Sequence, residues 1–253
     1  MSSLTYAVIN DVHIPNADSK VLQLCLSFLK RKEIKIDEII LNGDIVDCYP
    51  ISTFIRKPFS ASSIDLEIEE LGKFIKELQK ITKKITYIGG NHEDRSRKFI
   101  WKNEEIHKLG QDRGIGVSKL SFATLYGLED FGIKYLEYGD GIWLGKLWVT
   151  HGDVIRKHGG YTAKAEFEKN GCSTLTGHTH RLARTSVTLR GGTYASWENG
   201  CLCDLQPEYI KGIPNWQHGF AIVNVSDNKG FFSVQQIDIL NRSSLWYGGK
   251  EYS

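Results

Sequence analysis

The sequence contains no apolar run that is long enough to cross a membrane. None of its 253 residues belongs to an uninterrupted apolar stretch of about 18 residues, the length that a transmembrane helix requires. The first residues, MSSLTYAVIND, lack the basic region followed by an apolar stretch that is typical of a secretory signal peptide. We therefore expect a soluble, cytoplasmic protein with no membrane partner.

The sequence has few cysteines, and its positive and negative charges nearly balance. The five cysteines are scattered, at Cys25, Cys48, Cys172, Cys201 and Cys203. An odd, scattered set favours reduced thiols over a disulfide framework, and no second cysteine pair completes a zinc site with the last two. Lys and Arg number 32 against 30 Asp and Glu, so no global positive field requires a polyanionic partner, although a local basic patch remains compatible.

Several catalytic signatures are missing as well. The chain has no G-x-S-x-G nucleophile elbow and no H-E-x-x-H helix, and residues 139–146 lack the spacing of a phosphate-binding P-loop. It also has no internal repeat, no low-complexity tract and no Pro/Gly/Ser-rich linker. With 41% hydrophobic and 25% charged residues, the chain has the composition of a globular protein, and we expect one domain over residues 1–253.

Apolar runs alternate with helical patterns in the first two thirds of the chain. Five short β-branched runs predict buried strands, at residues 5–11, 38–44, 84–91, 147–152 and 173–179. Helical patterns cover residues 19–32, 62–81 and 161–171; the second opens on a Ser62-x-x-Asp65 capping box and the third ends at Gly171. A further helix is expected after Glu93. This alternation is typical of an α/β fold with a largely parallel sheet.

The pattern changes after Arg184. The following runs are strand-like, with turn residues between them and no convincing helix, which favours antiparallel strands. Residues 228–230, Asn-Lys-Gly, predict a hairpin turn. We therefore expect two packed mixed β-sheets flanked by helices. The stretch around residues 95–140 is a candidate for an insertion that shapes the substrate site.

Polar segments follow each of the five predicted strands. They read DVH at 11–13, GDIVD at 43–47, GNHE at 90–93, HGD at 151–153 and GHTH at 177–180, and they hold five of the eight histidines. Ligands of α/β sheets bind beyond the carboxyl ends of the strands, so these segments predict a single site. His178 and His180 would point the same way from an extended segment, as paired metal ligands do, although an isolated H-x-H is more often surface loop.

The residue types suit a pair of divalent ions. Such ions take mixed carboxylate, amide and imidazole ligands, and two ions about 3.5–4 Å apart need a ligand that bridges them, as an aspartate can. The candidate ligands are Asp11, His13, Asp44, Asn91, His151, His178 and His180. They would form two incomplete coordination shells, which leaves room for water and a substrate.

The ordered series D-x-H, G-D-x-x-D, G-N-H-E, H-G and G-H-x-H resembles the calcineurin-like metallophosphoesterase superfamily over residues 5–180. The resemblance implies an αββα sandwich. It also implies that one ion is held by Asp11, His13, Asp44 and His180, and the other by Asp44, Asn91, His151 and His178. We expect two divalent cations, with manganese favoured and iron, nickel or zinc as alternatives.

The expected activity is hydrolysis of phosphate esters. Two cations would polarise the phosphoryl group and activate a water, and His92, which stays off the metals, is the candidate general acid. Protein Ser/Thr phosphatases of this superfamily continue G-D-x-x-D with Arg-Gly, whereas this chain continues with Cys48 and Tyr49. That departure, the compact G-H-x-H and the Ile14-Pro15 after D-x-H favour a phosphodiesterase or nuclease that acts on DNA, RNA or a nucleotide.

Other functions stay open at this point. A phosphomonoesterase acting on a small or nucleotide substrate is one alternative, and a non-catalytic scaffold on the same fold is another. Arg95 and Arg181 are candidates for contacting the phosphate of the substrate because each lies close in sequence to predicted ligands. No sequence pattern specifies an oligomeric state.

Several neighbouring side chains are expected to help without touching an ion. Asp47, Glu93 and Asp153 are expected to orient histidines or to cap helices. Tyr194, Trp197 and Trp216 are candidates for stacking on a base, with core packing as the more ordinary use of each.

Overall fold

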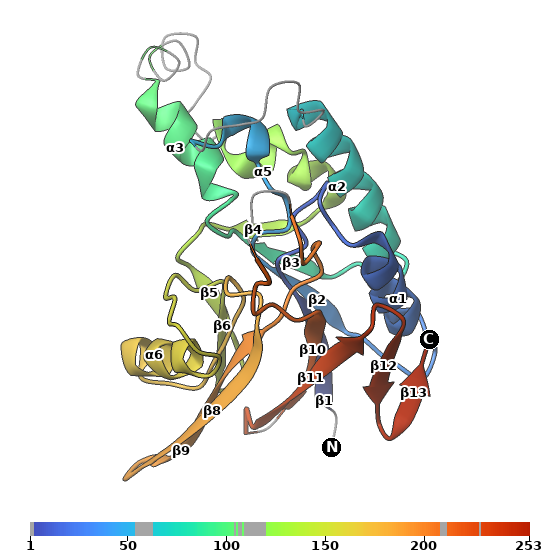
Figure 1. Ribbon diagram of the computed structural model, residues 1–253, viewed down its shortest axis with the longest axis vertical. Helices are drawn as coiled ribbons and strands as arrows, with labels where there is room; N and C mark the ends of the chain where they lie inside the picture. Colours follow the sequence, from blue (N-terminus) through green and yellow to red (C-terminus); the bar gives the residue numbers. More distant parts are fainter. Residues whose placement is uncertain are drawn as a thin grey trace.

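Two mixed β-sheets face each other in the computed structural model of the protein (Figure 1). The structure describes residues 3–53, 63–103, 105, 108, 120–207, 212–227 and 229–253. The larger sheet has eight strands, in the order β13-β12-β11-β10-β1-β2-β3-β4, and the smaller has five, in the order β5-β6-β7-β9-β8. The predicted fold class is therefore confirmed.

The eight-stranded sheet is parallel in its middle and antiparallel at one side. Strands β1 to β4 pair in parallel, and β10 to β13 add antiparallel strands next to β1. The bounds are β1 Ser3–Ile9, β2 Glu38–Asn42, β3 Ile85–Ile88, β4 Lys134–Leu136, β10 Gly219–Ser226, β11 Phe232–Leu240, β12 Ser244–Tyr247 and β13 Lys250–Tyr252.

The five-stranded sheet is mixed in the same way. Strands β6, β7 and β9 run parallel, and β5 and β8 pair antiparallel at its edges. The bounds are β5 Gly141–Leu144, β6 Leu147–Thr150, β7 Thr174–Thr176, β8 Leu182–Leu189 and β9 Gly192–Asn199.

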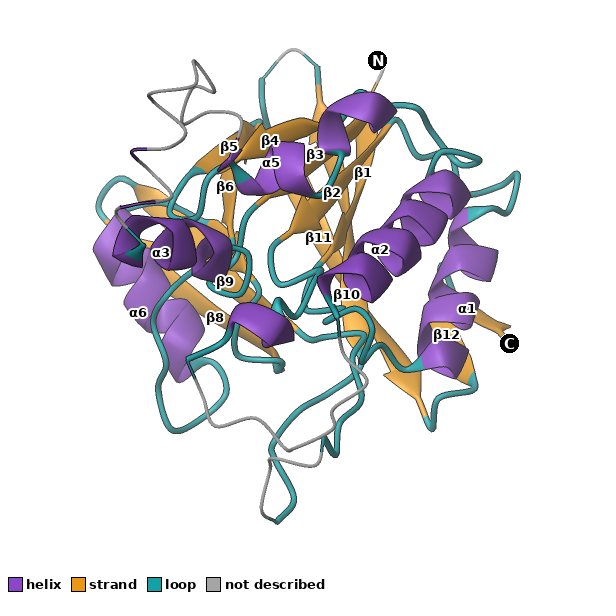
Figure 2. Cartoon of the chain, turned by 90° about the horizontal axis from the view of Figure 1, so that it is seen from above, coloured by secondary structure: helices purple, strands orange, loops and turns teal. Residues whose placement is uncertain are grey.

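Helices cover the outer faces of the two sheets. α1 and α2 lie over the eight-stranded sheet, and α6 lies against β7, β8 and β9 of the smaller one (Figures 1 and 2). The bounds are α1 Ser19–Leu29, α2 Ile64–Leu78, α3 Asp94–Lys102, α5 Phe122–Leu125 and α6 Tyr161–Asn170, with short 3₁₀ helices η1 Tyr49–Ile51 and η3 Leu128–Phe131. Among the described residues, no helix has both the length and the apolar character that a bilayer span needs.

Strand periodicity divides the apolar side chains between two cores. Along β1, Ala7 and Ile9 enter the core beneath α1 and α2, whereas Val8 enters the core between the sheets. The core between the sheets also receives Leu175 from β7 and Trp197 from β9. Successive side chains of a strand point to opposite faces, so a central strand that serves two cores must be apolar throughout. This explains the unbroken apolar runs in the sequence.

Most predicted elements are present, with shifted ends. α2 begins at Ile64 with Ser63 as its cap, whose Oγ accepts the Leu66 N–H at 3.1 Å; the predicted cap, Ser62, lies outside the described residues. α1 ends at Leu29 rather than at residue 32. α6 ends where predicted, since Gly171 takes a left-handed φ of 68°.

The strands after Arg184 pair antiparallel as predicted, except that β9 also pairs in parallel with β7, and several short elements were not predicted. β10 and β11 form the predicted hairpin, although position 228 of its turn lies outside the described residues. Strands β4, β5, β12 and β13 and helix α5 have at most four residues each, which is too short for a periodic pattern. Within the suggested insertion, β4 pairs with β3 and Phe122 packs in the core beneath the helices.

Five of the parallel strands stop just before a predicted ligand segment. β1, β2 and β3 end at Ile9, Asn42 and Ile88, and β6 and β7 of the other sheet end at Thr150 and Thr176. The turns that follow carry the polar motifs. The sandwich therefore brings five chain segments, three from one sheet and two from the other, to one end.

Substitution of Phe28 tests the packing of the core beneath α1 and α2. Phe28 is 1% exposed and its ring contacts Phe220, Tyr247 and Tyr252, with centroids 5.2–5.8 Å apart. We expect Phe28→Ala to lower the free energy of unfolding by about 4 kcal/mol because it leaves a cavity. Urea unfolding should show a lower midpoint with an unchanged slope. Phe99→Ala, at a ring that is 44% exposed, is the control, and equal effects would contradict this packing.

Candidate metal centre

The turns after β1 and β2 are joined by their backbones. Asp11 N–H donates to the Gly43 carbonyl and His13 N–H donates to the Asp44 carbonyl, both at 3.0 Å. In the other sheet, Gly177 N–H donates to the His151 carbonyl at 3.0 Å. Asp11 links the two sheets, since its Oδ2 accepts the His178 N–H at 2.9 Å. The predicted ligand segments therefore lie against one another.

Two clusters of potential ligand atoms meet at this point. Asp11, His13 and Asp44 form one, and His180 Nε2 lies 3.1 Å from both Asp11 Oδ1 and His13 Nε2. Asp44, His151 and His178 form the other, and Asn91 Oδ1 lies 3.3 Å from His151 Nε2. All seven side chains that the sequence suggested as ligands are thus brought together.

Asp44 belongs to both clusters. Its Oδ2 lies 3.3 Å from His151 Nε2 and 3.9 Å from His13 Nε2, and its Oδ1 accepts the His92 N–H at 2.9 Å. The residue is 2% exposed. A buried carboxylate with one oxygen facing histidines of two different loops has the position that a bridging ligand needs.

Unusual backbone conformations concentrate at the site. Eight described residues other than glycine have positive φ, and five of them are candidate ligands: Asp11, His13, Asp44, His178 and His180, with φ between 51° and 70°. This left-handed region is uncommon for residues with a Cβ and costs roughly 1–3 kcal/mol each time. The surrounding contacts must therefore hold these residues in place.

Glycines permit the close approach of the loops. A Cβ on Gly43 would collide with the His151 ring, and one on Gly90 would collide with Asp44. A Cβ on Gly177 would lie 2.6 Å from Asp11 Oδ2. The glycine of each of these motifs is required because another ligand residue occupies the space where its side chain would be.

Glu93 fixes the turn that carries Asp44. Its two carboxylate oxygens accept the backbone N–H groups of Asp44, Ile45, Val46 and Gly90 at 2.7–3.1 Å, and Oε1 also accepts the Tyr87 hydroxyl at 2.6 Å. Glu93 is fully buried. It was expected to orient a histidine or cap a helix. Instead it binds the backbone of two ligand turns, and its residue type alone gave no signal for this.

Partners on the far side of each imidazole orient the candidate ligands. His151 Nδ1 donates to the Asn42 carbonyl at 2.8 Å, which directs the Nε2 lone pair towards Asp44. His180 Nδ1 lies 3.8 Å from Cys203 Sγ, a partner that the sequence did not suggest. Both rings therefore present Nε2 to the centre.

His92 lies beside the clusters, held by Asp47 and Arg95. Its Nδ1 is 2.7 Å from Asp47 Oδ1, and Arg95 donates to its Nε2 at 3.0 Å. Arg95 also donates to the Asp47 carbonyl at 2.7 Å. Asp47, His92 and Arg95 thus form a compact group, and His92 Nε2 lies 3.7 Å from Asp44 Oδ2. Asp47 orients His92 as the sequence predicted.

The carboxylates set the proton affinities of the histidines. Burial opposes the charged form of His151, but the charge of Asp44 outweighs it and raises the pKa to about 10. Burial likewise opposes charge on His180, but Cys203 and Asp11 raise its pKa to about 9. Burial, helped by the neighbouring His151, lowers the pKa of His178 to about 4. The centre therefore holds protons at neutral pH where cations are expected.

The donor atoms fit divalent cations. Asp11 Oδ1 is buried and has no hydrogen-bond partner of acceptable geometry, although His180 Nε2 lies 3.1 Å away. His13 Nε2 and His180 Nε2 lie 3.1 Å apart, so protons on both nitrogens would bring two donors together. Carboxylate oxygens, imidazole nitrogens and one amide oxygen are the mixture that such ions accept. A cation would supply the charge that these atoms lack.

The other residues suggested by the sequence are spread around the centre. Arg181 follows His180 and donates to the Arg156 carbonyl at 2.6 Å. Asp153 does not orient a histidine, because its carboxylate pairs with Lys169 at the surface. Trp197 is buried in the core between the sheets, and Tyr194 packs against Phe167 of α6. The histidines outside the motifs are a buried one, His218, and an exposed one, His158; His107 lies outside the described residues.

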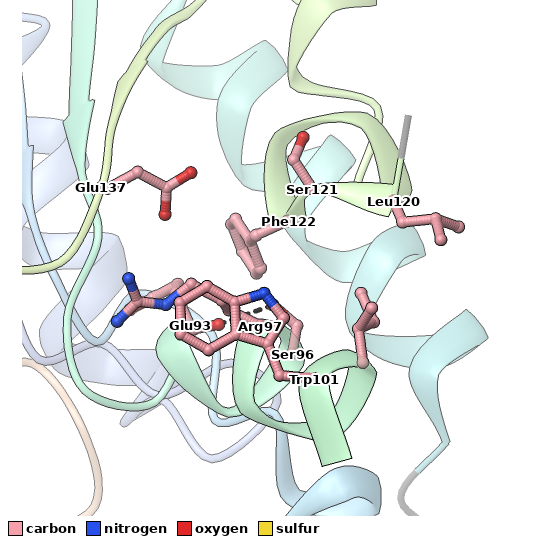
Figure 3. A pocket seen from close by; sticks show the side chains of 9 residues that line it. Glu93, Ser96, Arg97, Trp101, Leu120, Ser121, Phe122 and Glu137 are labelled. Carbon is pink, nitrogen blue, oxygen red and sulfur yellow. Dashed lines mark hydrogen bonds between the residues drawn. The ribbon is translucent and has the colours of Figure 1, made fainter. Parts of the chain in front are cut away.

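One cavity, of about 210 Å³, lies between α3 and α5 rather than at the clustered ligands. Arg97, Trp101, Phe122 and Glu137 point into it from different elements, with Glu93 at its inner end (Figure 3). The Arg97 guanidinium is already paired with Asp94. The candidate metal centre is therefore located by the converging donor atoms and not by this cavity.

The sandwich and the clustered donors define the class of protein, and the comparison with known families agrees. A model of the calcineurin-like phosphoesterase family matches residues 4–185, and the chain belongs to this family. Divalent metal binding is typical of the family, and the His/Asp clusters supply suitable ligands. No curated protein matches the sequence.

Several solved structures are similar to this chain at low identity. Vacuolar Protein Sorting 29 from Cryptosporidium parvum is 14% identical, with a TM-score of 0.49 over 99% of this chain and 98% of that chain. A hypothetical protein from Pyrococcus horikoshii is 15% identical, with a TM-score of 0.49 over 93% and 88% of the two chains. A predicted phosphoesterase from Streptococcus pneumoniae is 17% identical, with a TM-score of 0.38 over 100% and 98%.

Glu93→Gln tests the support of the Asp44 turn. A glutamine offers one acceptor oxygen and turns an N–H₂ group towards buried N–H donors, so we expect the free energy of unfolding to fall by about 3 kcal/mol. Divalent-ion affinity, measured by calorimetry, should fall as well. Glu69→Gln, on the exposed face of α2, is the control and should change neither quantity. A Glu93→Gln variant as stable as the parent would contradict this role.

Ion binding should release protons. The pKa values of about 10 and 9 mean that His151 and His180 are protonated in the metal-free protein at pH 7, and both must lose that proton to bind an ion. Burial opposes charge on His13, but hydrogen bonds to Asp11 and Asp47 raise its pKa as well, so we expect release of at least two protons per chain on full loading. Titration calorimetry with Mn²⁺ in Pipes and in Tris buffer measures this, because the apparent enthalpy changes with buffer ionisation. Identical enthalpies in the two buffers would contradict it.

Proposed function

We propose that this protein is a phosphodiesterase that depends on two divalent cations, with manganese favoured. The observation that carries the proposal is the position of Asp44, buried and within reach of ligand atoms from both clusters. Asp11, His13, Asp44 and His180 would hold one ion, and Asp44, Asn91, His151 and His178 the other. When bound, the ions supply Lewis-acid charge to the phosphoryl group and activate a water for attack.

The candidate site residues differ in burial. Asp11, His13, His151 and His180 are buried, whereas Asn91, His92 and His178 are half-buried. A phosphate ester would approach from the half-buried side, where His92 is the nearest group that can carry a proton. The leaving-group oxygen would therefore meet His92 as it departs.

His92 would donate that proton from Nε2. Its Nδ1 is held by Asp47, which fixes the ring plane. In the structure Arg95 donates to Nε2. A phosphate oxygen is a stronger acceptor for a guanidinium than a neutral imidazole nitrogen is, so we expect Arg95 to turn to the substrate and free Nε2 for proton transfer.

The distribution of positive charge supports a diester substrate. Cys48, where protein Ser/Thr phosphatases have arginine, is fully buried, with its Sγ 3.5 Å from the Tyr126 hydroxyl. Among the described residues, the basic side chain that contacts His92 is Arg95, and Asp47 partly neutralises it. A diester carries one negative charge and a monoester close to two, so a single, partly neutralised arginine beside His92 suits the diester.

Metal content and two chromogenic substrates test the proposal. Purified protein loaded with Mn²⁺ should hold two ions per chain and hydrolyse bis(p-nitrophenyl) phosphate faster than p-nitrophenyl phosphate. Asp44→Asn should lower both ion content and hydrolysis, because an amide offers a single ligand oxygen. Asp130→Asn, at an exposed carboxylate of η3, is the control. Metal-free, inactive protein would favour a scaffold, and faster hydrolysis of the monoester would favour a phosphomonoesterase.

His92→Ala tests the proton donor. General acid catalysis contributes about 10²- to 10⁴-fold, and it matters most for leaving groups of high pKa. With a series of methyl aryl phosphates, the variant should lose little rate on p-nitrophenyl and progressively more on less acidic phenols. The slope of log kcat against leaving-group pKa should therefore become steeper. His158→Ala, at an exposed histidine, should keep the parental slope, and a parallel loss across the whole series for His92→Ala would contradict the assignment.

A further inference from the structure

Trp216 lies at the edge of the ligand clusters with its ring outside both hydrophobic cores. Its ring centroid is 4.3 Å from that of His180 at an interplanar angle of 63°, so the two rings are steeply inclined, and the indole is only half-buried. The backbone beside it is fixed, because Gln217 N–H donates to the His180 carbonyl at 2.8 Å and Leu182 N–H donates to Gln217 Oε1 at 3.1 Å. A half-buried tryptophan is thus held next to a candidate metal ligand.

The loop that follows His151 presents basic side chains beside His180, the histidine that Trp216 contacts. Residues 155–159 are all exposed and include Arg156 and Lys157, with no acidic residue among them. Arg181, directly after His180, donates to the Arg156 carbonyl at 2.6 Å and so joins this loop to the ligand turn. We call Arg156, Lys157 and Arg181 the basic rim.

The backbone of the loop is anchored although its side chains are exposed. Glu166 Oε1 accepts the N–H groups of Asp153 and Val154 at 3.2 Å, and Thr162 Oγ1 accepts the Arg156 N–H at 3.1 Å. At the other end of the loop, Glu198 Oε1 accepts the Gly160 N–H at 2.6 Å. The rim therefore has a defined place beside the metal centre.

The charges of the rim lack carboxylate partners within the described part of the chain. No ion pair involves any of its three residues, and Arg181 Nε is buried without a hydrogen-bond partner. Elsewhere on the surface, Lys30 and Lys80 pair with Glu77, and Lys73 pairs with Glu69. Unpaired guanidinium and ammonium groups next to a phosphate-processing centre are suited to further phosphate groups of the same substrate.

From these features we propose that the substrate is a single-stranded oligonucleotide. Trp216 stacks on a base next to the scissile phosphate, and the basic rim binds phosphates of the adjoining backbone. Aromatic stacking combined with local positive charge is the mode by which proteins bind unpaired strands, and a duplex keeps its base faces covered. The near-zero net charge of the chain is compatible with this because the positive charge is local. The inference rests on the proposed phosphodiesterase activity.

Stacking is tested with a strand that lacks bases. Manganese-loaded Trp216→Ala should lose roughly 5- to 100-fold in kcat/KM on a single-stranded oligothymidylate. It should lose almost nothing on an abasic oligonucleotide of the same length. Trp216→Phe should recover most of the loss, and Trp246→Ala, at a tryptophan that is 52% exposed on β12, is the matched control. Equal losses on the two strands would show a structural role and overturn the assignment.

The basic rim is tested by salt dependence. For single strands, log kcat/KM falls with log[NaCl] by about 0.7 for each phosphate contact, so Arg156→Ala/Lys157→Ala should lower the slope by about 1.4. Lys83→Ala/Lys84→Ala removes two exposed lysines before β3, at the opposite end of the parallel strands, and should keep the parental slope. The same slope in the rim variant as in the parent would overturn the role of the rim.

The outcomes separate this inference from the function on which it rests. If the parent protein hydrolyses neither bis(p-nitrophenyl) phosphate nor oligothymidylate, the phosphodiesterase proposal fails. If it hydrolyses the small diester and leaves single-stranded DNA and RNA intact, only the oligonucleotide inference fails. Duplex DNA cleaved as fast as the single strand, with no effect of Trp216→Ala, overturns the inference as well. Cleavage of single-stranded DNA or RNA supports the inference if Trp216→Ala loses activity on the strand with bases and keeps it on the abasic strand.

Discussion

The carboxylate of Glu93 is the constraint on which the candidate centre depends. Four backbone N–H groups and one hydroxyl donate to it, and they come from the turn after β2, the turn after β3 and the end of β3 itself. It thereby fixes Asp44 relative to Asn91 and His92. Since Asp44 faces both ligand clusters, an error in its position would disturb both at once. A different arrangement of the turns would leave the buried Glu93 carboxylate without these donors, which would destabilise the fold. The interaction therefore favours a single arrangement of the turns.

Strain and close packing come from the same requirement. Five candidate ligands have left-handed backbones, and three glycines leave room for a neighbouring ligand residue. Both features follow from directing side chains of five turns into a small volume without secondary structure to support them. Hydrogen bonds between the turns and from Glu93, together with the apolar packing of the strands beneath, hold conformations that an isolated peptide would avoid. The rigid strands therefore position the centre, and the turns provide its chemistry.

The sequence predicted the layered fold and the convergence of the ligand segments because both depend on patterns along the chain. Buried parallel strands are continuous apolar runs, and the residues after them must meet at one end of a sheet. Three features depended on tertiary contacts and were not predictable in this way. Glu93 could not be distinguished from an ordinary helix-capping acid, and Cys203 beside His180 belongs to no motif. Asp153 was expected to orient a histidine or to cap a helix, but it pairs with Lys169. Strands of three or four residues, such as β4 and β13, carry too few side chains to show a period.

Order along the chain has a further consequence for assembly. The ligand segments of the larger sheet lie within residues 11–92 and those of the smaller sheet within residues 151–180, while β10, the antiparallel neighbour of β1, lies at Gly219–Ser226. During synthesis the amino-terminal strands leave the ribosome first, and β10, which pairs with β1, is synthesised much later. Neither coordination shell can close before most of the polypeptide has emerged. A nascent chain would therefore compact around its apolar strands first, and cation uptake would be a late event rather than one that nucleates folding.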